Sequence, residues 1–236
     1  MVRIAILQPG YLPWLGFFEQ MYMSDVFVIY DDVQYDKQGW RNRNRIKTGN
    51  GVQWVTIPVN FKFKEFPLTN EVTIDNRMNW RKKHFLSIKQ NYSKAPFYKD
   101  YIELVEEVYS REWQYLIDID LYLITELANC LGMNDKKIVR SSSLGVRGGR
   151  IERLTTMCKI FKADIFYEGT AGGNYIDEKH FEEHGIMVEF QDYKHPVYKQ
   201  LHGDFVPYLS VIDLLFNIGP ESLSVIANKN FIEDTG

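Results

Sequence analysis

Two adjacent carboxylates and one histidine are the side chains of this sequence best suited to acid–base chemistry. Asp31 and Asp32 directly follow the apolar run 26–30, and His195 stands in a later polar segment. Paired carboxylates can bind a metal ion, accept hydrogen bonds from sugar or ribose hydroxyls, or deprotonate an amine. Histidine titrates near neutrality and suits proton transfer. We expect Asp31, Asp32 and His195 to be catalytic, the alternative for the aspartates being a turn cap and a solvated acid.

A basic segment follows the two carboxylates. Residues 36–47 hold five lysines and arginines, with a tryptophan and two asparagines among them, in a chain of net charge −3. The planar guanidinium group binds phosphate oxygens in pairs. On a hairpin, alternation separates the two residue types, with Arg41, Arg43 and Arg45 on one face and Asn42 and Asn44 on the other. The expected ligand is a sugar nucleotide or another phosphorylated small molecule. Single-stranded RNA, such as tRNA, is less favoured, and a solvated loop is the structural alternative.

The segment 8–17 contains two prolines and two glycines, and it links the apolar run 4–7 to the helix expected at 14–23. Free N–H groups and the positive end of the dipole make such a helix start suitable for phosphate. The arrangement resembles the opening of nucleotidyltransferases and class I synthetases. Trp14 and Phe17 stand where those enzymes carry the histidines of a His-x-Gly-His motif, which argues against histidine-assisted adenylyl transfer. A purely structural tight turn is the other interpretation.

A second glycine-rich turn, residues 168–175, follows the apolar run 164–167. Its three glycines free the backbone to line a ligand, as in phosphate-binding loops. The turn matches neither a Walker A motif nor a dinucleotide-binding fingerprint. Its position after a buried strand favours binding over a plain turn.

These segments need a scaffold, and the hydrophobic pattern predicts a doubly wound α/β fold of Rossmann or HUP type with a mostly parallel sheet. The expected strands are 4–7, 26–30, 52–59, 137–140, 164–167 and 186–190. The expected helices are 14–23, 80–92, 98–109, 112–131, 149–161, 177–184 and 209–216. We expect one domain over residues 1–228, with a helical insertion at about 78–131 and a flexible tail at 229–236.

In doubly wound sheets, ligands bind outside the carboxyl ends of the strands, where the strand order reverses. We therefore expect four separate segments to meet in one crevice. They are residues 8–14, 31–34, 141–143 and 168–175.

Composition limits the other classes of function. With 236 residues, 45% of them hydrophobic and 25% charged, the chain can bury a large core, and its net charge requires neither nucleic acid nor membrane.

Cys130 and Cys158 lack metal-ligand spacing and are expected to be buried free thiols on helices. His84, His180 and His184 are expected on polar helix faces, and no metal site is predicted. The apolar run near the N-terminus is too short for a signal peptide, and no other apolar run is long enough to span a membrane. We therefore expect a cytoplasmic protein.

Several separated motifs occur in a characteristic order. They are Gln8, Pro9, Tyr11, Pro13, Trp14 and Gly16; residues 24–26, 31–35, 42–47 and 141–142; the turn ending at Tyr175; His195, Pro196, Tyr198 and Gln200; and Leu209, Ser210, Asp213 and Gly219 around 214–217. Together they resemble the WbqC-like protein family over residues 4–222. Glu168 departs from the serine that this family usually has there. The resemblance implies a role in making or decorating bacterial surface polysaccharide such as O-antigen.

The leading hypothesis is a transferase that adds an acyl or aminoacyl group to an amino sugar or sugar nucleotide, with no cofactor named. An adenylate-forming ligase or nucleotidyltransferase, and a non-catalytic sugar-nucleotide-binding module, are the alternatives. Arg43, Arg45 and Lys47 would hold a diphosphate. The residues expected to bind substrate or phosphate are Gln8, Tyr11, Trp14, Gln34, Asn42, Arg43, Asn44, Arg45, Lys47, Ser142, Glu168, Gly169, Gly172, Gly173, Tyr175, Tyr198 and Gln200.

Overall fold

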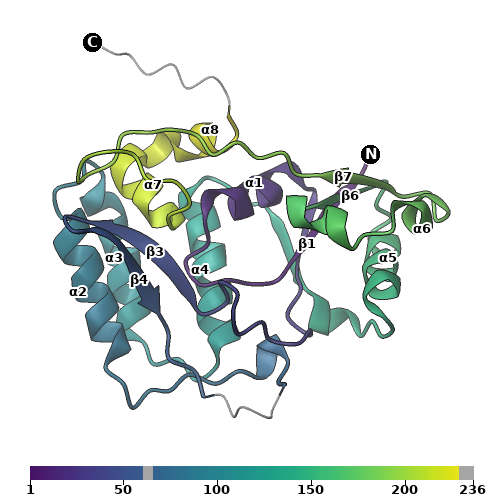
Figure 1. Ribbon diagram of the computed structural model, residues 1–236, viewed down its shortest axis with the longest axis horizontal. Coiled ribbons are helices and arrows are strands. Elements are labelled where there is room, and N and C mark those ends of the chain that lie inside the picture. Colours follow the sequence, from purple (N-terminus) through teal and green to yellow (C-terminus); the bar gives the residue numbers. More distant parts are fainter. Residues whose placement is uncertain (61–65, 229–236) are drawn as a thin grey trace.

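A parallel sheet forms the centre of the computed structural model, which describes residues 1–60 and 66–228. Within these residues, the sheet has five strands in the order β5–β2–β1–β6–β7 (Figure 1). The strands are β1 (Arg3–Leu7), β2 (Val26–Ile29), β5 (Lys137–Arg140), β6 (Ile165–Glu168) and β7 (Met187–Phe190). The chain moves outward from β1 to β5 and then returns to place β6 beside β1. This is the doubly wound order, and it confirms the predicted fold class.

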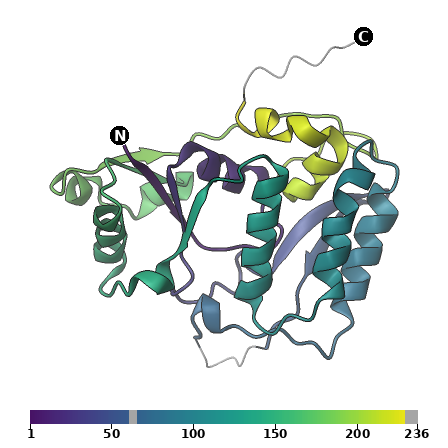
Figure 2. The same ribbon diagram turned by 180° about the vertical axis from the view of Figure 1, so that it is seen from behind.

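Helices cover both faces of this sheet (Figures 1 and 2). The buried side chains of β1 alternate between the two faces. Ile4 and Ile6 belong to one buried cluster, together with Leu154 and Phe181 from the helices α5 and α6. Ala5, between them, belongs to the cluster on the opposite face. The helices that border the sheet are α1 (Leu15–Met23), α4 (Leu116–Cys130), α5 (Arg150–Ile160) and α6 (Glu178–Glu182). Because successive strand residues point to opposite faces, short apolar strands suffice to build two cores.

An antiparallel hairpin lies beside the central sheet. It joins β3 (Arg43–Thr48) to β4 (Gly51–Thr56) as a separate two-stranded sheet. Its inner face buries Ile46 and Val55 in the same core as α1 and α4. The strand expected at 52–59, with its break at Pro58, is present as β4, which stops at Thr56, and as an isolated bridge at Val59. Pro58 contributes no backbone N–H to a ladder, which explains the early end.

Further helices are α2 (Trp80–Tyr92), α3 (Tyr98–Ser110), α7 (Val211–Ile218) and α8 (Ser222–Ile226). Helix α2 packs on β3, α3 packs on α2 and α7, and α8 packs on α1. The helix predicted at 112–131 begins only at Leu116, because Gln114 and Tyr115 are extended and pair with residues 73–74. The predicted flexible tail, 229–236, lies outside the described residues.

The expectation that His84 is solvated is wrong. Its ring is buried on α2, with Nδ1 3.0 Å from the Tyr11 hydroxyl and with Trp80 and Tyr109 packed around it. Burial lowers the pKa of His84 to about 4. A histidine that is neutral at physiological pH therefore serves the core here.

Asp31 fastens the carboxyl end of β2 to that of β5. Its carboxylate is fully buried and accepts hydrogen bonds from the Ser142 N–H (3.0 Å), the Ser142 hydroxyl (2.9 Å) and the Arg140 guanidinium (2.7 Å). Burial alone would raise the pKa of Asp31, but the bonds from Ser142 and Arg140 hold it below its usual value. Both oxygens are therefore occupied in holding two strand ends together.

Asp31→Asn should lower the free energy of unfolding at pH 7 by roughly 2–4 kcal/mol, because an amide replaces a buried hydrogen-bonded charge. A folded-state pKa below the unfolded value near 3.9 stabilises the protein above that pH, and the stabilisation is lost on acidification. Urea unfolding should therefore show the gap between wild type and variant narrowing below about pH 4. The exposed Asp135→Asn is the control. An equal, pH-independent loss of stability in both variants would contradict the role of Asp31 in holding the ends of β2 and β5 together.

Candidate functional site

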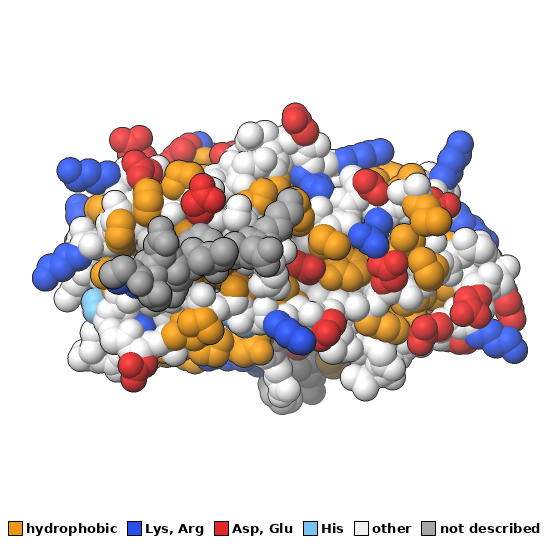
Figure 3. Space-filling view, turned by 90° about the horizontal axis from the view of Figure 1, so that it is seen from above, with side chains coloured by type: hydrophobic (Ala, Val, Ile, Leu, Met, Phe, Trp, Pro, Cys, Tyr) orange, Lys and Arg blue, Asp and Glu red, His pale blue; other side chains and the backbone are white. Residues whose placement is uncertain are grey.

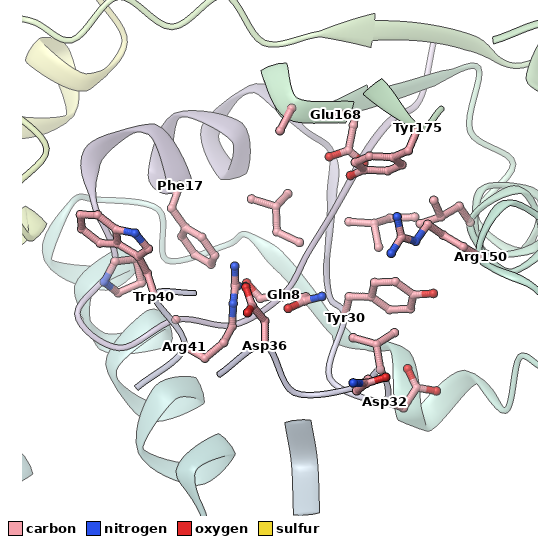
Figure 4. A pocket seen from close by; sticks show the side chains of 18 of the residues that line it. Gln8, Phe17, Tyr30, Asp32, Asp36, Trp40, Arg41, Arg150, Glu168 and Tyr175 are labelled. Atoms are coloured by element: carbon pink, nitrogen blue, oxygen red, sulfur yellow. The ribbon is translucent and has the colours of Figure 1, made fainter. Parts of the chain in front are cut away.

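A cavity of about 990 Å³ opens where the strand order reverses. Its wall includes Gln8 after β1, Asp32 after β2 and Glu168 at the end of β6 (Figure 4). Ligand sites for small molecules and cofactors typically measure roughly 300–1,000 Å³. The cavity lies at the position that open α/β sheets use for binding, and it is large enough for a nucleotide-sized ligand.

Four arginines line this cavity, and two of them are already engaged. The guanidinium of Arg153 pairs with Asp32 at 2.6 Å and lies over the ring of Tyr30. Arg41 donates to the backbone carbonyls of Gln8 (3.0 Å) and Pro9 (2.9 Å). Asp32 thus neutralises Arg153, while Arg41 is held in place by the loop after β1.

The other two arginines keep their charge available. Arg45 donates to the Tyr208 carbonyl at 2.8 Å and lies over the ring of Trp40. Arg150, in the first turn of α5, lies 4.8 Å from the centroid of the Tyr175 ring. Within the part of the chain that the structure describes, no ion pair joins either residue to an acidic side chain. The cavity therefore offers positive charge to an anionic ligand.

Glu168 is the carboxyl group of the cavity with the most altered acidity. It is 7% exposed, and its Oε1 accepts a hydrogen bond from the Gly169 N–H at 2.9 Å. Burial raises the pKa of Glu168 to about 7, against the opposing effects of the Gly169 N–H, the Tyr175 hydroxyl and Arg150. Burial likewise raises the pKa of Tyr175 to about 12. Glu168 can therefore exchange a proton near neutral pH.

Gly172 makes room for this carboxyl group. A Cβ atom at residue 172 would lie 2.2 Å from Cγ of Glu168 and 3.2 Å from the ring of Phe190. At the neighbouring Gly173, a Cβ atom would meet nothing within 4 Å. The two adjacent glycines are therefore not equivalent, although the sequence does not distinguish them.

The structure brings part of the expected binding set together at the cavity. The expected residues that line it are Gln8, Trp14, Asp32, Gln34, Asn44, Arg45, Glu168 and Tyr175. The expected residues that lie outside its lining are Tyr11, Asp31, Asn42, Arg43, Lys47, Ser142, Gly169, Gly172, Gly173, His195, Tyr198 and Gln200. Residues 8–14, 31–34 and 168–175 each contribute to the wall. Residues 141–143 do not line it, but the Ser141 hydroxyl donates a hydrogen bond to the wall residue Asp32, and Ser142 donates to Asp31.

Several residues of the second group hold segments of the chain together. The Asn42 amide donates to the Ile57 carbonyl at 2.7 Å, and the Tyr198 hydroxyl donates to Asp213 at 2.8 Å. The Lys47 ammonium, 2% exposed, donates to Gln200 and to the Gly203 carbonyl, both at 3.1 Å. These bonds tie the hairpin to the segment before α7.

His195 packs behind the cavity wall. Its ring lies 6.5 Å from Trp14 and 5.3 Å from Tyr208, measured between ring centroids, and both of those rings face the cavity. Nδ1 lies 2.9 Å from the Pro196 carbonyl, and burial lowers the pKa of His195. The geometry is that of a neutral imidazole supporting two aromatic side chains.

The expected set also lacks cavity residues that could contact a ligand, among them Tyr30, Trp40, Arg41, Arg150 and Arg153. A signal for the last two exists, since a Gly-Gly-Arg sequence opens the helix predicted at 149–161. Residues three apart share a helix face, so Arg150 and Arg153 point to the same side. No comparable signal marks Tyr30, which ends a buried run.

Outside this cavity, a second, smaller cavity of about 500 Å³ lies between the tip of the hairpin and α2. On the face shown in Figure 3, acidic and basic side chains are interspersed. In residues 1–60 and 66–228, no three His, Cys, Asp or Glu side chains gather in a way that could hold a metal ion. Among the described helices, none combines the length and apolar character needed to cross a bilayer.

Fold and cavity together define an α/β protein with a doubly wound sheet and a ligand-sized site at its switch point. The chain belongs to the WbqC-like protein family, whose model matches residues 8–225. It is also 36% identical over 224 residues to the uncharacterized protein Rv1507c of Mycobacterium tuberculosis (strain ATCC 25618 / H37Rv), covering 94% of this chain and 96% of that protein. No solved structure matches the chain significantly. The predicted family is confirmed.

The two glycines of the β6 turn provide a matched test of the site's packing. Gly172→Ala should lower the free energy of unfolding by about 1–3 kcal/mol, because the added methyl displaces the buried Glu168 side chain. Gly173→Ala should stay within about 0.5 kcal/mol of wild type. Denaturant unfolding measures both, and a carboxyl ¹³C NMR titration should show a changed pKa of Glu168 in Gly172→Ala alone. An equal loss of stability and an equal pKa of Glu168 in the two variants would refute the close packing of Glu168 against Gly172.

Proposed function

We propose that the chain is a transferase that adds an acyl or aminoacyl group to an amino sugar carried on a phosphorylated group, in bacterial surface-polysaccharide biosynthesis. The observation that carries this proposal is the pairing, in one cavity, of the near-neutral Glu168 with the unneutralised Arg45 and Arg150. Such a set suits a ligand with both a basic amine and phosphate groups. The surface-polysaccharide role implied by the family resemblance agrees with this chemistry.

In the proposed reaction, Glu168 acts on the amine. As a carboxylate, it binds the sugar ammonium and takes one proton, which leaves a nucleophilic lone pair on nitrogen. The lone pair attacks the carbonyl of the donor, the C–N bond forms, and the bond to the leaving group breaks. The leaving group accepts a second proton from nitrogen, so the product is a neutral amide. Arg45 and Arg150 hold the phosphates of the reactants.

The geometry favours Glu168 over the other acids and bases. Both oxygens of Asp31 are occupied by Ser142 and Arg140. Asp32 pairs with Arg153 and so orients that cation. Proton transfer is therefore assigned to Glu168, with Asp32 in a supporting role.

The adenylate-forming alternative has less support. It places phosphate at the start of α1, but the indole of Trp14 lies against Gly16 there, where a Cβ atom would be 2.2 Å from the ring. ATP consumption with pyrophosphate release during product formation would establish this alternative instead. Tight binding without turnover would indicate a binding module.

Glu168→Gln should lower the transfer rate by about 10²–10⁴-fold, because the amide has a similar shape but accepts no proton. The assay incubates nucleotide-linked amino sugars with acyl thioesters or aminoacyl esters and detects the sugar amide by mass spectrometry. Affinity for the amino-sugar nucleotide should change far less than the rate. The exposed Glu182→Gln is the control.

The pH profile gives an independent check on the same variant. Since the base works only when deprotonated, kcat/KM of the wild type should rise tenfold per pH unit below the pKa of about 7 and level off above it. This rise of kcat/KM with pH should disappear in Glu168→Gln. A variant with wild-type activity and an unchanged profile would exclude Glu168 as the base.

A further inference from the structure

The end of the cavity opposite Glu168 carries a different set of groups. Trp40 lies there, well separated in Figure 4 from Glu168, Tyr175 and Arg150, and it is 36% exposed. Trp14 and Tyr208 line the same cavity, with their ring centroids 5.5 Å apart. This end therefore offers aromatic surface to a ligand, where the other end offers a carboxyl group.

Positive charge lies next to this aromatic surface. The Arg45 guanidinium is 5.1 Å from the centroid of Trp40, and Arg41 is anchored to the carbonyls of residues 8 and 9. The Nε atoms of both arginines are buried and lack a hydrogen-bond partner within the described residues. Asp36 also lines this end and offsets part of the charge of Arg41. Arg45 remains as the cation without an acidic partner.

Gln8 connects the two ends. It lies between Trp40 and Arg150 in Figure 4, and its buried Oε1 accepts no hydrogen bond within residues 1–60 and 66–228. A buried carbonyl oxygen without a donor is costly, and a ligand hydroxyl placed there would satisfy it. The cavity thus presents, in order, an indole, arginines, an amide oxygen and a carboxyl group.

We infer, on the basis of the proposed function, that the Trp40 end is a nucleobase subsite and that the sugar is carried on a nucleoside diphosphate. The base stacks on Trp40, the diphosphate lies against Arg41 and Arg45, and a hydroxyl of the sugar beyond the diphosphate donates to Gln8. This places the amine of the sugar at Glu168. The sequence of chemical groups in such a ligand matches the sequence of groups along the cavity wall.

The reverse orientation fits the charges less well. A base on Tyr175 would bring its phosphates beside Glu168, whose carboxylate repels them. The Tyr175 ring is also covered by Arg150, and the Tyr175 hydroxyl is hydrogen-bonded to Glu168. The sugar amine would then face two cations, Arg41 and Arg45, with Asp36 offsetting part of the charge of Arg41. At the Glu168 end the amine has the carboxylate as its partner and one cation, Arg150, nearby. Electrostatics therefore selects the Trp40 end for the base.

The test compares two neighbouring tryptophans. Trp54 lies 5.0 Å from Trp40 between ring centroids, is 44% exposed and also contacts Arg45, but it does not line the cavity. Calorimetric titrations with UDP, ADP, dTDP and inorganic pyrophosphate measure the contribution of the base. Trp40→Leu should weaken the best-binding nucleoside diphosphate about tenfold or more, the size of one base–aromatic stack. Pyrophosphate binding should be unchanged, and Trp54→Leu should stay within about twofold of wild type.

Tryptophan fluorescence gives a second readout. Quenching by the nucleoside diphosphate should occur in the wild type and in Trp54→Leu, and it should be strongly reduced in Trp40→Leu, where Trp14 is the indole that still lines this end of the cavity. Equal weakening by the two substitutions would overturn the subsite, as would pyrophosphate binding as tightly as every nucleoside diphosphate. So would a loss of base-dependent affinity in Tyr175→Leu rather than in Trp40→Leu.

The subsite and the proposed transfer reaction can fail separately. If Glu168-dependent amide formation occurs while nucleoside diphosphates bind no better than pyrophosphate, the base subsite is wrong and the transfer reaction stands. If nucleoside diphosphates bind through Trp40 but no amide forms with any amino sugar, the subsite stands and the transfer reaction is wrong.

Discussion

Strands β1 and β6 lie side by side in register, yet the helices that follow them, α1 and α6, pack on opposite faces of the sheet. The two connections must therefore diverge as they leave the strands, and the space between them is closed by side chains alone. Gln8 and Glu168 enter this space from the two strands, and Asp32 enters from β2. The cavity is thus a consequence of chain direction, and its chemistry depends on which residues stand at three strand ends.

Charge in this protein is organised locally. The whole chain has a net charge of −3, yet three of the four arginines that line the cavity, Arg41, Arg45 and Arg150, form no ion pair with an acidic side chain among the described residues. Burial within the cavity raises the pKa of Glu168, because little water reaches the carboxyl group, while Arg150 beside it stays exposed to solvent. A site that combines free cations with a proton acceptor near neutrality is suited to substrates bearing phosphate and amine together.

The sequence predicts the central sheet well, because short apolar runs bounded by turns leave few alternatives. It describes the hairpin less well, since β3 alternates polar residues on both faces and buries Asn44 through bonds to the carbonyls of residues 11 and 12. His84 could not be placed from its own helix, because its partner Tyr11 is 73 positions away. Distant partners decide such burials, and local periodicity does not contain them.

In the candidate site too, the sequence does not determine what each single residue does. Asp31 and Asp32 are adjacent and chemically identical, but one is enclosed by Ser142 and Arg140 while the other faces the cavity. Sequence reasoning found the correct strand ends and could not assign a role to each residue, because that depends on the direction of each side chain. Arg150 was within reach of such reasoning, since it opens a helix at the carboxyl side of the sheet.

The alternation along β3 also determines where the chain can change in length. Arg45 points to the cavity while Asn44 and Ile46, on either side, are buried. Deleting one residue within this strand would turn the guanidinium toward the core and an aliphatic side chain toward the ligand. The turn at residues 49–50 faces no such constraint, because it lies beyond the last paired residues, Thr48 and Gly51. A change in length at the tip of the hairpin therefore leaves the register of both strands intact, whereas a change within either strand shifts it.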